Sequence, residues 1–368
     1  MPAVSFRKEI VYVAVTVLCL IAILEGISRA VLSSDMFFNR LAGNDQSSWR
    51  LSWIKRHPKF DTIQYDFDIH DPVRGWALKP GLNNVLVWGD KVLSSNSKGI
   101  RGRTEYLYTK PADKTRILML GDSFTFGEEV GDRETFPYYL EKILPNSEVI
   151  NMGVHGYGHD QMLLYLKEEG VKYRPDIVIL GFLYYDMERN LLNFRDYGKP
   201  KFKLVNGQLR LVHCPVPPPK QMIQSEFFKF KLVDLWTILV NRYADACGVN
   251  DHKMKKITKA ILREIVRTAE GIHAIPVFVY LPNERDFENF FDAPSQREKF
   301  FLDTCREENF HCTSVRPAFL AQLKRGIPLG YYGHWGPKGH WLAARVIRSY
   351  LEQKNFVVGA VRKTNASS

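Results

Sequence analysis

Residues 116–127 read Arg-Ile-Leu-Met-Leu-Gly-Asp-Ser-Phe-Thr-Phe-Gly. An apolar run followed by Gly-Asp-Ser predicts a buried strand that ends in a tight turn. In open α/β sheets the active site lies at the carboxyl ends of the strands. On such a turn Ser123 presents its hydroxyl, and its own backbone N–H is free to bind an anion. We therefore take Asp122 and Ser123 as the first candidate site residues.

The chain beyond this turn alternates between short apolar runs and amphipathic stretches. Strands are predicted at residues 148–151, 176–181, 275–280 and 311–314, and helices at 134–144, 160–169, 253–270, 295–308 and 317–323. Strands that alternate with helices indicate parallel βαβ units with right-handed crossovers.

Two further turns follow predicted strands and carry candidate site residues. Residues 151–158 are rich in glycine, and Gly156, with Gly153 as the second choice, can bring a backbone N–H close to a developing oxyanion. Residues 181–186 read Gly-Phe-Leu-Tyr-Tyr-Asp, which places Tyr185 and Asp186 after the third strand as residues that line the site.

The core ends with Tyr-Tyr-Gly-His-Trp-Gly-Pro-Lys-Gly-His at residues 331–340. Pro337 suits the first turn of a helix, so His334 stands just before that helix and His340 lies inside it. We expect His334 to be the functional histidine, with Tyr331 and Tyr332 lining the site beside it.

Taken together, these blocks resemble the SGNH (GDSL) hydrolase superfamily over about residues 115–350. The resemblance implies a three-layer α/β/α fold with a flavodoxin-like parallel sheet. It also implies that Ser123 is the nucleophile and His334 the general base, with an oxyanion hole formed by the N–H groups of Ser123 and Gly156.

The chain departs from the family at two side chains. The family has an Asn where Tyr185 stands, and this Tyr either substitutes for the amide donor, blocks the site or shapes a different pocket. The family also has an Asp two or three residues before its histidine, where this chain has Tyr331 and Tyr332. A carboxylate that holds the imidazole in its productive tautomer would have to come from elsewhere.

An apolar run from Ile10 to Leu24 follows Arg7 and Lys8 near the N-terminus. We expect a signal anchor over residues 10–32 with a cytoplasmic tail at residues 1–9, because the basic residues favour a cytoplasmic N-terminus. A cleaved signal peptide is the alternative, although no small-x-small cleavage site follows Leu24.

The remaining chain divides by composition. Residues 33–110 are predicted to be an extension packed on the core, and residues 111–360 the hydrolase-like domain. An insertion at about 190–250 is expected to form a lid over the site, and residues 361–368 a disordered tail.

Charge and cysteine content limit the classes of partner. The 368-residue chain carries a net charge of +11, but no nucleic-acid motif accompanies it, so the excess charge favours an anionic membrane surface. Cys305 and Cys312 are close enough in sequence to form a disulfide. Neither a metal-ligand spacing nor a phosphate-binding loop occurs, and we expect no metal and no cofactor.

These observations predict a membrane-anchored serine esterase or O-acyltransferase outside the cytoplasm. Its substrate would be an ester-linked acyl group, acetyl by family analogy, on a cell-envelope or extracellular polysaccharide or lipid, with a membrane acyl-transfer protein as a partner. The alternative is a catalytically weakened domain that binds glycan or supports envelope assembly.

Overall fold

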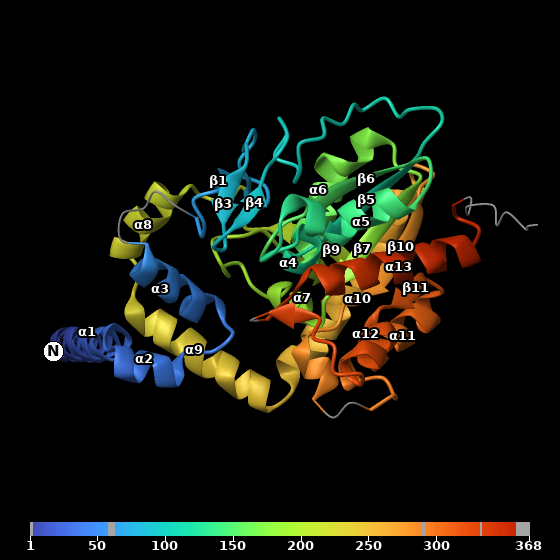
Figure 1. The fold of residues 1–368 in the computed structure, drawn as a ribbon. Helices are drawn as coiled ribbons and strands as arrows, with labels where there is room; N and C mark the ends of the chain where they lie inside the picture. Colours follow the sequence, from blue (N-terminus) through green and yellow to red (C-terminus); the bar gives the residue numbers. More distant parts are fainter. Residues whose placement is uncertain (1–2, 58–62, 289–290, 332, 358–368) are drawn as a thin grey trace, which may run out of the picture.

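A parallel sheet forms the centre of the computed structural model, which describes residues 3–57, 63–288, 291–331 and 333–357. Its strands are β5 (Thr115–Gly121), β6 (Ser147–Gly153), β7 (Ile177–Phe182), β10 (Ile275–Tyr280) and β11 (His311–Ser314). They pair in parallel in the order β11-β10-β7-β5-β6 (Figure 1). Because β5 has a neighbouring strand on each side, the turn after β5 lies at the carboxyl edge of the sheet between the ends of β7 and β6.

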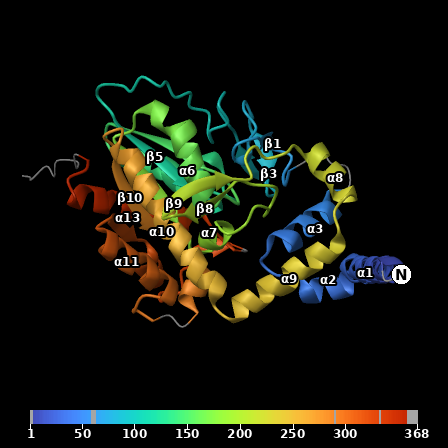
Figure 2. The same ribbon diagram turned by 180° about the vertical axis from the view of Figure 1, so that it is seen from behind.

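Helices cover both faces of the sheet and confirm the predicted three-layer α/β/α fold. The helices of the two outer layers are α5 (Phe136–Ile143), α6 (His159–Glu168), α10 (Val249–Glu270), α11 (Gln296–Glu308), α12 (Arg316–Leu323) and α13 (Pro337–Gln353). Side chains alternate along each strand. Leu118 and Leu120 therefore pack in one core with α6, α10 and α11, while Ile117 and Met119 pack in the other with α5, α12 and α13. Figures 1 and 2 show these layers from opposite sides.

The extension before the core forms two small hairpins. They are β1 (Asp68–Asp71) with β2 (Gly75–Leu78), and β3 (Val85–Val87) with β4 (Lys91–Leu93). The Trp76 indole N–H donates to the carbonyl of His155 at 3.0 Å, and the Tyr157 hydroxyl donates back to the carbonyl of Trp76. These bonds attach the extension to the turn after β6.

The N-terminal helices pack with two helices of the insertion beside the core (Figure 1). These helices are α1 (Ala3–Ser33), α2 (Asp35–Leu41), α3 (Gln46–Arg56), α8 (Pro219–Phe227) and α9 (Lys231–Ala246). Arg50 of α3 forms buried ion pairs with Glu226 and Asp234 of the insertion. The hairpin of the insertion, β8 (Lys201–Val205) with β9 (Gln208–Val212), packs on the core beside α10. Within α1, residues 8–33 are long and apolar enough to cross a membrane.

Short elements and one disulfide complete the fold. The short elements are α4 (Ser123–Phe126), α7 (Tyr184–Arg189), β12 (Gly330–Tyr331), β13 (His334–Trp335) and the 3-10 turns at Asp132–Glu134, Gly170–Tyr173 and Glu284–Phe287. Cys305 is bonded to Cys312, the pair that the spacing predicted. The predicted tail at residues 361–368 lies outside the described residues.

Candidate active site

Ser123 follows β5 on a turn that the local sequence makes tight. The Asp122 carboxylate caps α4 by accepting the Phe124 N–H at 3.1 Å. A side chain at Gly121 would not fit, because its Cβ would lie 1.9 Å from Thr125 Oγ1. Ser123 is thereby fixed at the carboxyl end of β5.

His334 reaches Ser123 from the other end of the domain. Its Nε2 lies 2.9 Å from Ser123 Oγ. The neighbouring Trp335 is buried against the Phe124 ring, with ring centres 5.1 Å apart, and its indole N–H donates to the carbonyl of Pro282 at 3.0 Å. A hydroxyl bonded to an imidazole nitrogen is the geometry in which a base activates a nucleophile.

The second histidine of the last block lies apart from this contact. His340 is buried in α13, where its Nδ1 accepts the Phe136 N–H at 3.1 Å. Burial lowers the pKa of His340 to about 3, so it stays neutral and its role is structural. Tyr331 pairs with His334 across the β12–β13 hairpin, and Tyr332 lies outside the described residues.

Two glutamates from the loop after α4 flank His334. Glu129 Oε1 lies 3.5 Å from His334 Nδ1, and Glu128 Oε2 lies 3.9 Å from His334 Nε2. Glu128 is held by the Tyr65 hydroxyl at 2.6 Å. Among the described residues, His334 Nδ1 and Glu129 Oε2 are buried without a hydrogen-bond partner. A carboxylate therefore lies beside His334 Nδ1, and it belongs to the loop that follows Ser123.

Arg101 of the N-terminal extension anchors this loop. Its guanidinium donates to the carbonyls of Phe126 and Gly127 at 2.7 Å and to that of Val130 at 2.6 Å. Burial lowers the pKa of Arg101 to about 10, which leaves it charged at neutral pH. Glu129 has a φ of 67°, a left-handed conformation that costs a non-glycine residue roughly 1–2 kcal/mol. The three carbonyl contacts offset that cost and fix the direction of the Glu129 side chain.

Ser123 and Gly156 carry the N–H groups of the predicted oxyanion hole. In the described part of the chain, neither N–H group donates to a backbone carbonyl. Gly156 has a φ of 73°, and a Cβ there would lie 2.2 Å from Asp196 Oδ2, so only glycine fits. Gly153 closes β6, and a Cβ there would lie 2.4 Å from Phe126 N. The role of the Gly156 N–H stays a prediction.

Tyr185 and Asn283 line the cavity where the missing Asn donor was expected. Tyr185 follows β7, and Asn283 follows the neighbouring strand. The Tyr185 ring lies 5.5 Å from the guanidinium of Arg285 and 4.9 Å from that of Arg297. Asn283 follows β10, and its carbonyl oxygen accepts the Arg285 N–H at 3.0 Å. Within the described residues, Asn283 Nδ2 is buried and unpartnered. The cavity therefore contains an amide donor, although on the next strand along.

Buried charges lie beneath the serine. Arg189 Nη1 lies 3.3 Å from Asp122 Oδ2 and 2.5 Å from Asp186 Oδ1. Burial, and then the charge of Asp122, raises the pKa of Asp186 well above its ordinary value, although Arg189 opposes this. Asp122 Oδ2 lies 3.4 Å from Ser123 Oγ. Asp186 therefore holds Arg189 in place through the ion pair. In the described part of the chain it makes no hydrogen bond to Ser123.

Ser123 and His334 open into a cavity of about 420 Å³. One wall comes from α3 and the segment before it, where the indole N–H of Trp49 in α3 donates to Asn44 Oδ1 at 2.8 Å. The insertion contributes Arg195, whose guanidinium stacks 4.0 Å above the Trp49 ring. The other parts of the insertion, α8 and α9, pack against α1–α3.

Ser123 and His334 lie together at the sheet edge, as the resemblance to the SGNH hydrolases implies. Solved structures similar to this chain include a member of the lipolytic protein G-D-S-L family from Veillonella parvula (12% identity, 64% of this chain and 96% of that one, TM-score 0.37). Others are the psychrotrophic esterase EstA from Pseudoalteromonas (13%, 66% and 99%, 0.39) and the acetylxylan esterase Axe2 from Geobacillus stearothermophilus (14%, 66% and 96%, 0.38). No family model and no curated protein matches the chain.

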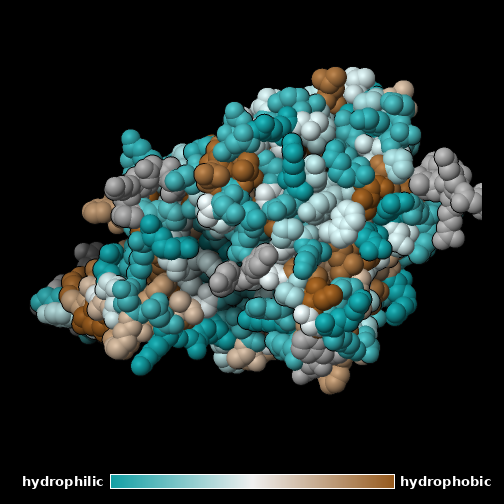
Figure 3. All heavy atoms as spheres, viewed as in Figure 1, coloured by the Kyte–Doolittle hydropathy of each residue, from teal (hydrophilic) through white to brown (hydrophobic). Residues whose placement is uncertain are grey.

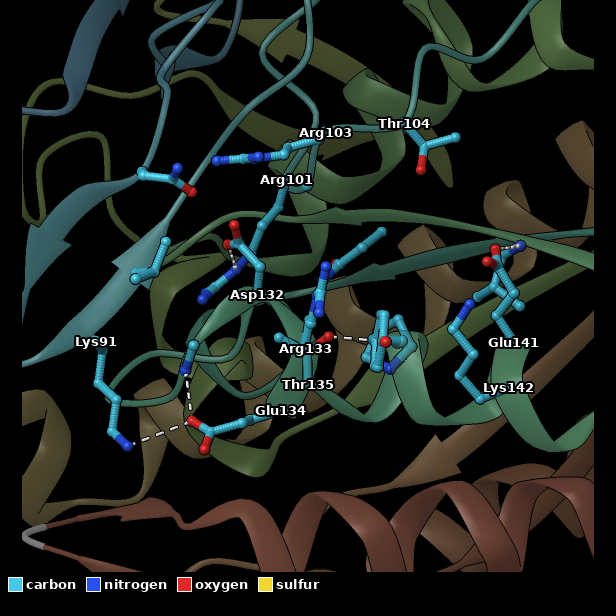
Figure 4. Close-up of a pocket in the computed structure, with 18 of the residues that line it drawn as sticks. Lys91, Arg101, Arg103, Thr104, Asp132, Arg133, Glu134, Thr135, Glu141 and Lys142 are labelled. Atoms are coloured by element: carbon cyan, nitrogen blue, oxygen red, sulfur yellow. Dashed lines mark hydrogen bonds and ion pairs between the residues drawn. The ribbon is translucent and has the colours of Figure 1, made fainter.

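A second cavity of about 700 Å³ is lined by residues of the N-terminal extension and by residues 131–142 (Figure 4). Two ion pairs join charged side chains of its lining. Lys91 lies 3.4 Å from Glu134, and Arg101 Nε lies 3.4 Å from Asp132. This cavity contains neither Ser123 nor His334, and its link to the site is Arg101.

The sequence prediction missed Glu129, Arg101, Asn283 and Trp49. A pair of acids six residues after the nucleophile was the one local signal for Glu129. The other three come from segments whose approach to Ser123 depends on tertiary packing alone. Among the described residues, no group of three or more His, Cys, Asp or Glu side chains could hold a metal ion.

Proposed function

We propose that this chain is a membrane-anchored serine esterase or O-acyltransferase that works through an acyl-enzyme. The observation that carries the proposal is the hydrogen bond of 2.9 Å between His334 Nε2 and Ser123 Oγ, with Glu129 on the opposite ring nitrogen. A module that only binds glycan has no physical need for this line of three groups.

In the proposed reaction Ser123 Oγ attacks the ester carbonyl carbon while His334 Nε2 takes the hydroxyl proton. The resulting oxyanion is held by the N–H groups of Ser123 and Gly156. As the tetrahedral intermediate collapses, His334 returns the proton to the leaving alcohol oxygen. Water or a sugar hydroxyl then attacks the acyl-enzyme and gives its proton to His334. As this second intermediate collapses, the bond to Ser123 Oγ breaks, His334 passes the proton to Oγ, and the carboxylic acid or the new ester is released.

Glu129 supports both proton transfers by acting on His334. A carboxylate beside Nδ1 favours the tautomer that carries its proton on Nδ1 and leaves Nε2 free to accept. It also stabilises the imidazolium that forms during each attack. In the free protein Nδ1 and Oε1 are 3.5 Å apart, which is longer than a good hydrogen bond. Such contacts often tighten when substrate binds.

We place the catalytic domain outside the cytoplasm, on the periplasmic or extracellular face, with α1 as a single-pass anchor. Apolar composition and length support the anchor, and the basic residues before it support the orientation. The proposed substrate is an acyl group, acetyl by family analogy, on a cell-envelope or extracellular polysaccharide or on a lipid. In the transferase case a membrane acyl-transfer protein would supply the acyl group.

Covalent labelling of the detergent-solubilised full chain with a fluorophosphonate probe tests the proposal. Wild type should be labelled, and Ser123→Ala and His334→Ala should not. Release of acetate from an acetylated polysaccharide, or its transfer to a second saccharide, then separates hydrolase from transferase. Folded wild type that resists labelling would favour the alternative of a glycan-binding or envelope-assembly module.

A further inference from the structure

An exposed apolar surface runs along α9 and the turn before it. On α9 the residues Val233, Trp236, Leu239, Val240 and Tyr243 recur at helical spacing and are exposed. The turn adds three phenylalanines, Phe227, Phe228 and Phe230. Phe227 is 83%, Phe228 81% and Trp236 67% exposed. We call this set the aromatic face. Contiguous exposed apolar surface of this kind marks an interaction site.

The aromatic face begins beside Glu25, the residue that follows the apolar run at residues 10–24 of α1. The Glu25 carboxylate accepts the first N–H groups of α9, from Lys231 at 3.1 Å and Leu232 at 2.9 Å. Arg29, one turn later in α1, lies 3.5 Å from the carbonyl of Lys229. These contacts fix the start of α9 at the carboxyl end of that run, in the last third of the 8–33 span.

The direction of α9 agrees with that position. Figures 1 and 2 show α1 along its axis, whereas α9 runs crosswise to it. A helix crosswise to a spanning helix lies along the membrane surface. Apolar residues also gather over α1 and α2 at the lower left of Figure 3.

The opposite side of α9 is the one that faces the protein. Ile238 and Leu235 pack with Leu32, Phe38 and Leu51 of the three N-terminal helices. Because α2 and α3 occupy this inner side, the aromatic face is turned away from the catalytic domain.

We infer that the aromatic face lies in the lipid interface of the membrane that α1 spans. The inference rests on the anchoring proposed above and adds a second, peripheral contact. Amphipathic helices insert their apolar side about 5–10 Å into the boundary between headgroups and acyl chains. Trp and Tyr are enriched at this depth, which suits Trp236 and Tyr243.

This contact also sets where the active site lies. The inner side of α9 packs on α3, and α3 carries Trp49 of the cavity wall. Arg50, next to Trp49, is paired with Asp234 of α9. The cavity that contains Ser123 is therefore held beside the membrane surface. The substrate class that fits this position is an ester carried on a membrane-attached molecule.

Quenching by spin-labelled lipid tests the interfacial position in the full chain. In a background where Cys19, Cys214 and Cys247 are Ser, Val240→Cys and Asp245→Cys each receive an environment-sensitive fluorophore. Both positions lie on α9, but Asp245 is not part of the aromatic face. In vesicles of phosphatidylethanolamine and phosphatidylglycerol with acyl-chain spin labels, the fluorophore at position 240 should lose most of its emission. The fluorophore at position 245 should keep it.

Two further measurements make the outcome decisive. Extraction with alkaline carbonate tests the anchor itself, and release of the chain would overturn both the anchoring and this inference. A retained chain whose label at position 240 is not quenched would overturn only the interfacial contact. Crosslinking through that position to a second copy or to another membrane protein, without quenching, would also overturn it. Trp236→Cys repeats the test if the Val240 variant does not fold.

Discussion

Replacing Glu129 by Gln removes the negative charge beside His334 while it keeps the side-chain size. Two unit charges 4 Å apart interact by about 4 kcal/mol at an effective dielectric constant of about 20. The Glu129 and His334 side chains are 25% and 21% exposed, so water screens part of this energy and we expect about 2–3 kcal/mol. Because this stabilises the imidazolium of the transition state, kcat should fall roughly 30- to 150-fold.

The matched controls are Glu129→Gly and Glu128→Gln. Glycine adopts the left-handed backbone of position 129 without strain, so Glu129→Gly should unfold at a temperature no lower than wild type. Its kcat should nevertheless fall as far as that of Glu129→Gln. Glu128 lies by Nε2 and does not face Nδ1. Its Gln variant loses some charge stabilisation but keeps the tautomer, and it should be the more active of the two Gln variants.

The assay is hydrolysis of a chromogenic acetyl ester by the full chain in detergent. A Glu129→Gln variant with unchanged kcat would refute the assignment, provided that Ser123→Ala is inactive. Loss of thermal stability in Glu129→Gly would show instead that the side chain serves the fold.

Two further outcomes follow from buried groups near the site. His340→Leu keeps the bulk of the ring but leaves the Phe136 N–H unpaired. The free energy of unfolding in urea should therefore fall by about 1–3 kcal/mol, while fluorophosphonate labelling persists. A stable variant without labelling would make His340 part of the reaction. The raised pKa of Asp186 means that the folded chain binds this proton more tightly than the unfolded chain, so ionisation weakens the fold as pH rises above about 4. The melting temperature of Asp186→Asn minus that of wild type should therefore increase from acidic to neutral pH. A difference that stays constant with pH would contradict the raised pKa of Asp186.

Local patterns were sufficient for much of the fold and for two residues of the site. The strand before Ser123 and the helix after His334 each follow from a few neighbouring residues: an apolar run that ends in a turn, and a proline at a first helical turn. The topology then brings both residues to one edge of the sheet.

The acid could not be found in this way. Glu129 faces His334 because Arg101, a residue of the extension, holds the loop by its carbonyls. No periodicity links residue 101 to residue 129, so the contact exists only in the folded chain. The same holds for α9, because its place beside α1 depends on Glu25 and its direction depends on packing against α3.

The cavity wall that α3 supplies bears on how this protein can be shortened. A chain that starts after Ser33 would lack Glu25, which caps the first turn of α9, and also Leu32, which covers its inner side. A chain that starts after Arg56 would in addition lack Asn44 and Trp49, which line the cavity of Ser123. If such a soluble fragment were inactive, the cause would be its open, incomplete pocket. The lack of activity would not show whether Ser123 is a nucleophile.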